Sequence, residues 1–284
     1  MGLSGRIVTC KEGRYFLAKV GHFLLHDTMT RVNMDFTQDV CYQGLFHLAD
    51  ALQEEKPAGL SVFGNWPTIY PALSQLPEQA KESWFAFDHY YSDAAFDAAL
   101  PYIFASSPTK LYDVGGNTGK WALRCCRYDD NVAVTILDLP QQITLAQENI
   151  EKAGLSHRIG FHAVDMLSHA TLPGEADIWW MSQFLDCFSP DQIVAMLTRV
   201  AQVMKPGARL CIMELFWDAQ KFEAASFSLN ATSLYFTCMA NGNSRFYSVE
   251  KFYHYLERAG FHVEQRLDNL GVGHTLLICQ KIEQ

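Results

Sequence analysis

The chain has 284 residues, of which 49% are hydrophobic and 19% are charged, and its formal net charge at pH 7 is −9. Disordered chains combine low hydrophobicity with high charge, so this composition indicates a globular protein with a sizeable core. The acidic excess argues against a nucleic-acid partner, because affinity for phosphate backbones depends on clustered Lys and Arg. No apolar run approaches the ~20 residues that cross a bilayer, so no membrane partner is expected.

The cysteines and histidines give no sign of disulfides or of a metal site. Two of the eight cysteines, Cys125 and Cys126, are adjacent, and no CxxC pair exists. With no secretory leader in the sequence, we expect free thiols and a cytoplasmic protein. The three closest histidines are His157, His162 and His169, whose spacing fits no common metal site. We therefore expect no bound metal.

Residues 1–107 differ in sequence pattern from the rest of the chain. They show mixed helical periodicity and many aromatic residues, without alternation of strands and helices. The turn cluster Ser106-Ser107-Pro108 precedes the first strong strand. The sequence therefore predicts a helical lid or dimerisation module over residues 1–107 and a catalytic domain over residues 108–284.

From Lys110 onward, strand-like apolar runs alternate with helical patterns, as in successive βαβ units. This alternation predicts an α/β, Rossmann-like fold with a seven-stranded, mostly parallel sheet and helices on both faces. The predicted strands are Lys110–Val114, Val132–Leu137, Ile159–Ala163, Ile178–Ser182, Arg209–Glu214, Phe261–Leu267 and Thr275–Cys279. The predicted helices between them are Lys120–Arg127, Gln141–Ala153 and Pro190–Met204.

A glycine-rich loop, Asp113 to Gly119, follows the first of these strands and opens a helix. The dinucleotide fingerprint G-x-G-x-x-G is not matched, because no glycine lies two residues after Gly115. The loop instead resembles the D-x-G-x-(G/N)-x-G cofactor loop of class I methyltransferases, with Asn117 at the middle glycine position. Asn tolerates a left-handed backbone, so this substitution is mild. We predict that Asp113, Gly115, Gly116 and Gly119 bind the cofactor.

Acidic residues also end the second and third strands. Asp138 is well placed to accept hydrogen bonds from both ribose hydroxyls, although it could instead cap the helix that begins near Pro140. Asp165 could accept from an adenine amino group while Met166 stacks on the ring. Such carboxylates suit a cationic sulfonium better than a pyrophosphate, which predicts S-adenosyl-L-methionine as cofactor. The predicted cofactor set also includes Leu139 and Ser182.

These motifs resemble the small-molecule O-methyltransferases typified by plant caffeate and animal hydroxyindole enzymes, with their bacterial relatives. The resemblance runs through residues 113–119, 137–140, 165–166, 205–207 and 230–261. In that family an N-terminal winged-helix-like module forms a homodimer, and Glu12 to Leu17 looks like its wing. The family's segment before the wing is absent. The resemblance therefore implies a partial winged-helix module, and either a truncated chain or a homodimer with a reduced interface.

One departure from the family concerns the catalytic base. The family usually places a histidine after the fourth strand, and this chain has Gln183 near that position. Glutamine cannot take up a proton at neutral pH, so it cannot be the general base. Three alternatives stay open: an acceptor acidic enough to ionise by itself, a base from elsewhere, for which His89 is the candidate, or attack by a ring carbon of a phenol that Gln183 orients.

The segment Phe222 to Asn243 mixes aromatic and aliphatic residues with Ser, Thr and Asn, as expected for the wall of a substrate site. Within it we predict substrate contacts from Asn230 and Tyr235. The predicted function is methyl transfer to a small phenolic or aryl acyl acceptor, free or carrier-bound, at oxygen or ring carbon. Two alternatives are a nicotinamide-dependent oxidoreductase, which the glycine spacing disfavours, and a cofactor-binding regulator with little or no activity.

Overall fold

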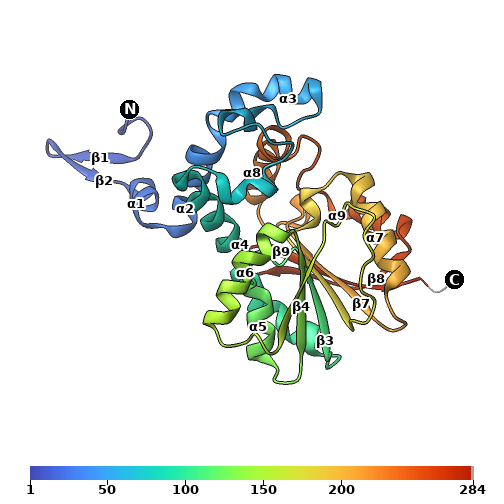
Figure 1. Ribbon diagram of the computed structural model, residues 1–284. Coiled ribbons are helices and arrows are strands. Elements are labelled where there is room, and N and C mark those ends of the chain that lie inside the picture. Colours follow the sequence, from blue (N-terminus) through green and yellow to red (C-terminus); the bar gives the residue numbers. More distant parts are fainter. Residues whose placement is uncertain (283–284) are drawn as a thin grey trace.

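The computed structural model describes residues 1–282 and contains a seven-stranded sheet below a layer of helices (Figure 1). The strand order is β5-β4-β3-β6-β7-β9-β8, and β9 runs in the direction opposite to the other six strands. The predicted mostly parallel, seven-stranded sheet is therefore confirmed. Its strands are β3 (Lys110–Val114), β4 (Ala133–Asp138), β5 (Ile159–Ala163), β6 (Ile178–Ser182), β7 (Arg209–Glu214), β8 (Phe261–Leu270) and β9 (His274–Lys281).

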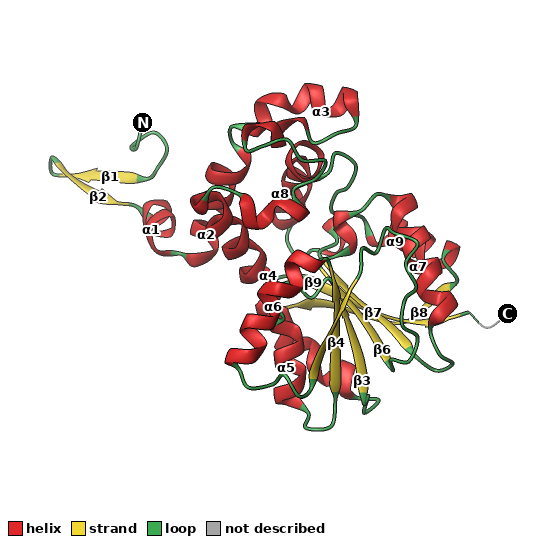
Figure 2. Ribbon diagram, viewed as in Figure 1, coloured by secondary structure: helices red, strands yellow, loops and turns green. Residues whose placement is uncertain are grey.

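Helices cover both faces of this sheet (Figure 2). On one face lie α5 (Lys120–Tyr128), α6 (Pro140–Lys152) and the second half of α4 (Glu78–Phe104), whose apolar side chains share one core cluster with the strands. On the other face lie α7 (Pro190–Val203) and α9 (Val249–Arg258). The three helices predicted between strands are confirmed to within two residues at each end.

The first residues form a hairpin of β1 (Val8–Lys11) and β2 (Arg14–Leu17). Its two turn residues, Glu12 and Gly13, both have positive φ, as two-residue hairpins of right-handed twist require. The hairpin occupies the segment that resembles a wing. Together with α1 (Lys19–His26) it projects away from the sheet, and α2 (Thr28–Phe36) packs along α4 (Figure 1).

The helical layer combines two distant stretches of chain. Residues 36–80 share an apolar cluster with Leu215 and residues 235–246. The layer contains α3 (Leu48–Glu54), α8 (Glu223–Tyr235) and the short 3-10 or π helices η1 (Thr37–Cys41), η2 (Gly44–His47), η3 (Ala58–Val62), η4 (Tyr70–Gln75) and η7 (Phe236–Ala240). One helix, α4, packs in this layer at its start and in the core of the sheet at its end, so the two predicted domains share contacts. The division of the chain at residue 107 stays a prediction.

All eight cysteines are free thiols, and only Cys10 is exposed. Within residues 1–282, no group of three or more His, Cys, Asp or Glu side chains is arranged to hold a metal ion. The described helices include none that is both long and apolar enough to cross a membrane.

Candidate cofactor and acceptor site

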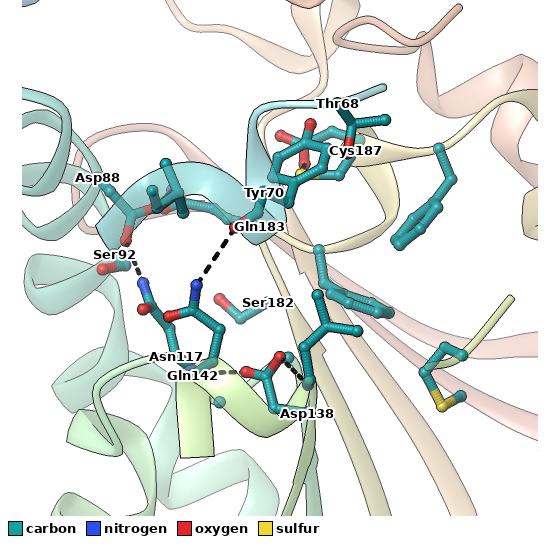
Figure 3. A pocket seen from close by; sticks show the side chains of 18 of the residues that line it. Thr68, Tyr70, Asp88, Ser92, Asn117, Asp138, Gln142, Ser182, Gln183 and Cys187 are labelled. Carbon is teal, nitrogen blue, oxygen red and sulfur yellow. Dashed lines mark hydrogen bonds between the residues drawn. The ribbon is translucent and has the colours of Figure 1, made fainter. Parts of the chain in front are cut away.

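A cavity of about 490 Å³ lies between the carboxyl ends of the parallel strands and the helical layer (Figure 3). Loops that follow strands of an α/β sheet commonly form the ligand site at this edge. Most of the predicted site residues line the cavity: Asp113, Gly115, Gly116, Asp138, Leu139, Asp165, Met166, Ser182, Gln183, His89 and Tyr235. The topology therefore brings together residues that the sequence separates by up to 146 positions, from 89 to 235.

Two predicted residues lie elsewhere. Gly119, with φ of 78°, begins α5, and a Cβ there would meet Ile150 at 3.1 Å, so this glycine serves the turn and the helix packing. Asn230 is exposed on α8, and its amide donates to the Ser226 carbonyl of the same helix at 3.2 Å. Asn230 is not among the residues that line the cavity, so its contact with substrate stays a prediction that this geometry does not favour.

The other glycines let the loop after β3 pack closely. Gly115 has φ of 71°, and a Cβ on it would lie 2.3 Å from the Phe184 ring. A Cβ on Gly116 would lie 2.8 Å from an oxygen of Asp113, beneath the loop. The loop therefore rests directly on neighbouring side chains, and its backbone can line the cavity.

Asp138 ties the end of β4 to the glycine loop. Its carboxylate accepts from the backbone N–H of Asn117 at 2.9 Å and of Leu139 at 2.7 Å. The N-cap of α6 is Leu139, without a side-chain cap. The alternative that Asp138 caps this helix is therefore wrong. Burial raises the pKa of Asp138 to about 6, in spite of these two donors.

Several buried polar atoms of the cavity lining have no partner within the protein. They include Asp113 Oδ2, Asn117 Oδ1 and Ser182 Oγ. Burial and the nearby charge of Asp138 raise the pKa of Asp113 to about 8. Unpartnered buried polar groups are destabilising, and a ligand that carries donors and positive charge would satisfy them. The lining therefore fits S-adenosylmethionine, which has an amino group, ribose hydroxyls and a sulfonium.

The loop after β5 supplies a polar and an apolar side chain. Asp165 is exposed and accepts from the backbone N–H of Leu167 at 2.8 Å, whereas Met166 is buried. Arg199 of α7 donates to the Met166 carbonyl at 2.7 Å and so fixes the loop. This pairing of a free carboxylate oxygen with a buried thioether suits the amino edge and the face of a purine.

The turn after β6 holds Gln183 in an unusual conformation. Its φ is 47°, a left-handed value that few non-glycine residues adopt, and its backbone N–H donates to the Met213 carbonyl at 3.0 Å. The next two residues, Phe184 and Leu185, donate their backbone N–H groups to the buried Glu214 carboxylate at 3.0 and 2.8 Å. These contacts set the position of the Gln183 side chain.

Gln183 lies in a chain of hydrogen bonds that leads to Asp88 of α4. Its amide nitrogen donates to Asp88 Oδ1 at 3.3 Å, and its amide oxygen lies 2.7 Å from Nε2 of His274. The other Asp88 oxygen accepts from the Asn117 side chain at 3.2 Å (Figure 3). Burial lowers the pKa of His274 to about 3, so this imidazole is neutral at neutral pH.

The predicted candidate base, His89, also lines the cavity. Its Nε2 lies 3.5 Å from the Thr118 hydroxyl, and its Nδ1 lies 3.8 Å from Asp93. Burial and the Lys120 charge lower the pKa of His89 to about 4, which makes it a weak proton acceptor. Its neighbour Asp88 has the opposite shift, because burial and the Asp93 charge raise its pKa to about 7.

The helical layer gives the cavity an aromatic wall. Phe36 and Phe87 stack with centroids 4.1 Å apart, and Phe36 meets the Tyr235 ring edge-on at 5.0 Å. The Tyr235 hydroxyl accepts from the Trp84 indole at 2.7 Å. This wall offers planar apolar surface with one hydroxyl, as an aromatic acceptor requires.

Sequence reasoning missed Asp88, Asn117 and His274 as site residues. Asp88 stands next to His89, and Asn117 lies within the glycine loop, so position in the chain could have suggested both. His274 begins the last strand and belongs to no motif. Only the pairing of β9 with β7 brings it beside the turn that carries Gln183.

Residues 45–262 match the family model described as an O-methyltransferase domain. This match covers more than half of the chain. The chain belongs to the O-methyltransferase family. The family uses S-adenosylmethionine, so the predicted enzyme class and cofactor are confirmed at the level of the family. The fit of the cavity to that cofactor agrees with this membership.

Two curated relatives of this methyltransferase are bacterial. An L-tyrosine C(3)-methyltransferase of Streptomyces lavendulae is 26% identical over 282 residues, which cover 97% of this chain and 76% of the relative. The N,N-dimethyltransferase OxyT of Streptomyces rimosus is 30% identical over 236 residues, which cover 82% of this chain and 66% of the relative. By their names, these two relatives methylate at a ring carbon and at nitrogen.

A solved structure of the same fold is the O-methyltransferase NcsB1 from neocarzinostatin biosynthesis, in complex with S-adenosylmethionine and 2-hydroxy-5-methyl naphthoic acid. It superposes with a TM-score of 0.75 at 18% identity and covers 99% of this chain and 82% of the solved chain. The likeness confirms the Rossmann-like fold with a helical N-terminal region.

Proposed function

We propose that this methyltransferase transfers the methyl group of S-adenosylmethionine to a small aromatic molecule that binds against the aromatic wall of the cavity. The observation that carries the proposal is the continuity of one cavity, which is lined by the loops after β3, β4, β5 and β6 and also by the rings of Phe36, Phe87 and Tyr235. A cofactor and an acceptor that share one cavity meet the main need of methyl transfer, which is alignment of the acceptor with the methyl group.

In this proposal each strand-end loop binds a different part of the cofactor. Asp138 accepts from the ribose hydroxyls, because each of its oxygens already accepts only one backbone donor. Asp165 and Met166 receive the adenine. The backbone at Gly115 and Gly116 passes along the methionyl part, and Asp113 and Ser182 supply the unpartnered oxygens nearby.

The acceptor is proposed to be phenolic, methylated at oxygen or at a ring carbon. The aromatic wall suits its ring, and the amide and carboxyl groups of Gln183 and Asp88 suit its hydroxyl. The names of the tyrosine C(3)-methyltransferase and of the naphthoate complex agree with an aromatic acceptor. The alternative of a regulator that binds cofactor without turnover rests on Gln183, which cannot act as a general base.

The first test is calorimetric titration with S-adenosylhomocysteine and with NAD. We expect tight binding of the first and none of the second, and the reverse would overturn the methyltransferase assignment.

Product analysis should then use S-adenosylmethionine with tyrosine, hydroxybenzoates and hydroxynaphthoates, each as the free acid and as a pantetheine thioester. A methylated product is expected from at least one of these acceptors. Cofactor binding without any product across the panel would favour the regulator.

We also propose a homodimer formed through the N-terminal region. The projecting hairpin and α1 expose large apolar side chains: Tyr15, Phe16 and Leu17, followed by Val20, Phe23 and Leu25. Contiguous exposed apolar surface of this kind marks an interaction site. Sedimentation equilibrium should give twice the 32.1 kDa chain mass.

We also propose a cytoplasmic location. The free thiols support it, because thiols stay reduced in the cytoplasm.

A further inference from the structure

The two carboxylate oxygens of Asp88 each accept from a side-chain amide, and the two amides come from different strand-end loops. Gln183, after β6, donates to Oδ1, and Asn117, after β3, donates to Oδ2. Each bond joins residues far apart in sequence, since 95 positions separate Gln183 from Asp88. The carboxylate therefore has a fixed place at the point where the cofactor loops meet the aromatic wall.

The orientation of the Gln183 amide follows from Asp88. An ionised carboxylate can only accept, so the NH₂ group of Gln183 faces Asp88 and its amide oxygen faces His274. The single N–H of the neutral His274 imidazole is then on Nε2 and donates to that oxygen. A second amide donor from Asn117 arrives at the other oxygen. Donors on both sides stabilise the ionised form of Asp88.

We propose that Asp88 accepts the hydroxyl proton of the aromatic acceptor, and that Gln183 and His274 are positioning residues that hold this carboxylate in place. The inference rests on the proposed function, because it needs a phenolic acceptor in the cavity. The proposed base therefore comes from α4, and it is hydrogen-bonded to Gln183, which stands near the family's position for the histidine.

The step balances as a single displacement. The acceptor hydroxyl passes its proton to the Asp88 carboxylate, and the electron pair of the O–H bond stays on the acceptor. The acceptor's oxygen or ortho ring carbon forms a bond to the methyl group while the methyl–sulfur bond breaks, and that electron pair stays on sulfur. For attack by carbon, the displaced ring proton returns to the acceptor's oxygen and restores the aromatic ring. Asp88 then releases its proton to water.

Charged and titratable groups from four elements face Asp88. On α4, Asp93 raises its pKa, and the His89 Nδ1 lies 3.9 Å away. Lys120 of α5 lowers the pKa of Asp88. The charge of Asp88 in turn raises the pKa of Asp186, which follows β6. Tyr235 of α8 also faces Asp88. With burial as the largest influence, the pKa of Asp88 reaches about 7, close to the working pH of a general base.

The main test compares Asp88→Asn with Asp97→Asn, which removes an exposed carboxylate of the same helix that pairs with Arg124 and does not line the cavity. With the acceptor found in the product screen, Asp88→Asn should lower kcat by about 10²- to 10⁴-fold, whereas its affinity for S-adenosylhomocysteine should stay within threefold. The control should keep the wild-type rate. The wild-type rate should rise with pH through about 7, as ionised Asp88 forms, and Asp88→Asn should lose this step.

Substitution of the positioning residue His274 should shift the pH dependence of the rate. His274→Ala frees the Gln183 amide, so ionised Asp88 loses a donor and the midpoint of the rate profile should move up by about 0.5 to 1 pH unit. His274→Gln restores an N–H donor and should bring the midpoint back. A merely structural role for His274 would lower the rate without moving the midpoint, which would overturn the positioning role.

Acceptor acidity gives an independent outcome. For a ring-nitrated analogue of the acceptor, already ionised at the assay pH, Asp88→Asn should lose less than tenfold in rate, because no proton has to be removed. An equal loss for both acceptors, or an Asp88→Asn variant within threefold of wild type with an unchanged pH profile, would overturn the proposal. Failure of wild type itself to methylate any acceptor would overturn the proposed function instead.

Discussion

The two ends of the cavity are built in different ways. The end proposed to bind the cofactor consists of short loops that follow consecutive strands, at residues 113–119, 138–139 and 165–166. The end proposed to bind the acceptor consists of single side chains from α2, α4, α8 and the turn after β6, where His274 of β9 contacts Gln183 from behind the lining. Backbone loops at strand ends keep their shape when sequences vary, whereas a set of separate side chains can be changed one at a time. The comparison explains how one family retains a cofactor while its acceptors differ.

The largest effect on cofactor binding is expected from a substitution in the loop after β3. Gly115→Val would place its Cβ within 2.3 Å of the Phe184 ring and force a β-branched residue into a left-handed conformation. We expect binding of S-adenosylhomocysteine to fall by at least about 100-fold in calorimetric titration, since backbone strain and the steric clash together cost about 3 kcal/mol or more. Gly154→Val is the matched control, because its φ of 72° is the same but no atom lies within 4 Å. Equal loss in both variants would show that strain alone is responsible.

Asp138→Ala should have the next largest effect. It removes the carboxylate that accepts from Asn117 and is proposed to accept from the ribose, so cofactor affinity should fall by about 1 to 3 kcal/mol. Titration with S-adenosylhomocysteine measures this. Adenine affinity serves as the internal control, because adenine is proposed to bind the loop after β5. An unchanged Kd together with a lowered Tm would mean that Asp138 only supports the loop.

Cofactor affinity should depend on pH in a definite direction. The raised pKa values mean that, in the free protein, Asp113 takes up a proton as the pH falls through about 8 and Asp138 as it falls through about 6. A cation binds the ionised forms, so affinity should rise with pH through these values, by up to about tenfold per pH unit for each group. S-adenosylmethionine should show a steeper rise than the neutral thioether of S-adenosylhomocysteine. Equal slopes would argue against a role for these carboxylates toward the sulfonium.

The smallest expected effects separate two residues of α8. Tyr235→Phe removes the hydroxyl that accepts from Trp84, and we expect a loss of about 0.5 to 1.5 kcal/mol in the free energy of unfolding, with a higher KM for the acceptor. Asn230→Ala should change neither quantity measurably, because Asn230 is exposed and outside the cavity. Chemical denaturation and initial rates measure both variants. A raised KM in Asn230→Ala would return that residue to the substrate site.

The sequence predicted the strands and the acids at their ends well, because strand periodicity and loop motifs are local. The seven strands, and the placing of Asp113, Asp138 and Asp165 at strand ends, follow from patterns within about ten residues of each site. The acceptor end depends on register across the sheet and on the path of the 27-residue α4, neither of which a local pattern specifies. The conformation of Gln183 and its partner His274 became visible only with the fold.

The most direct test is a single-turnover measurement of methyl transfer from S-adenosylmethionine, with product analysis, on wild type, Asp88→Asn and Gln183→His. The account predicts a methylated aromatic product from wild type and a rate reduced by about 10²- to 10⁴-fold in Asp88→Asn. It predicts no gain from Gln183→His, because that change breaks the link between His274 and Asp88. An O-methylated product formed faster by Gln183→His, together with full activity in Asp88→Asn, would contradict it.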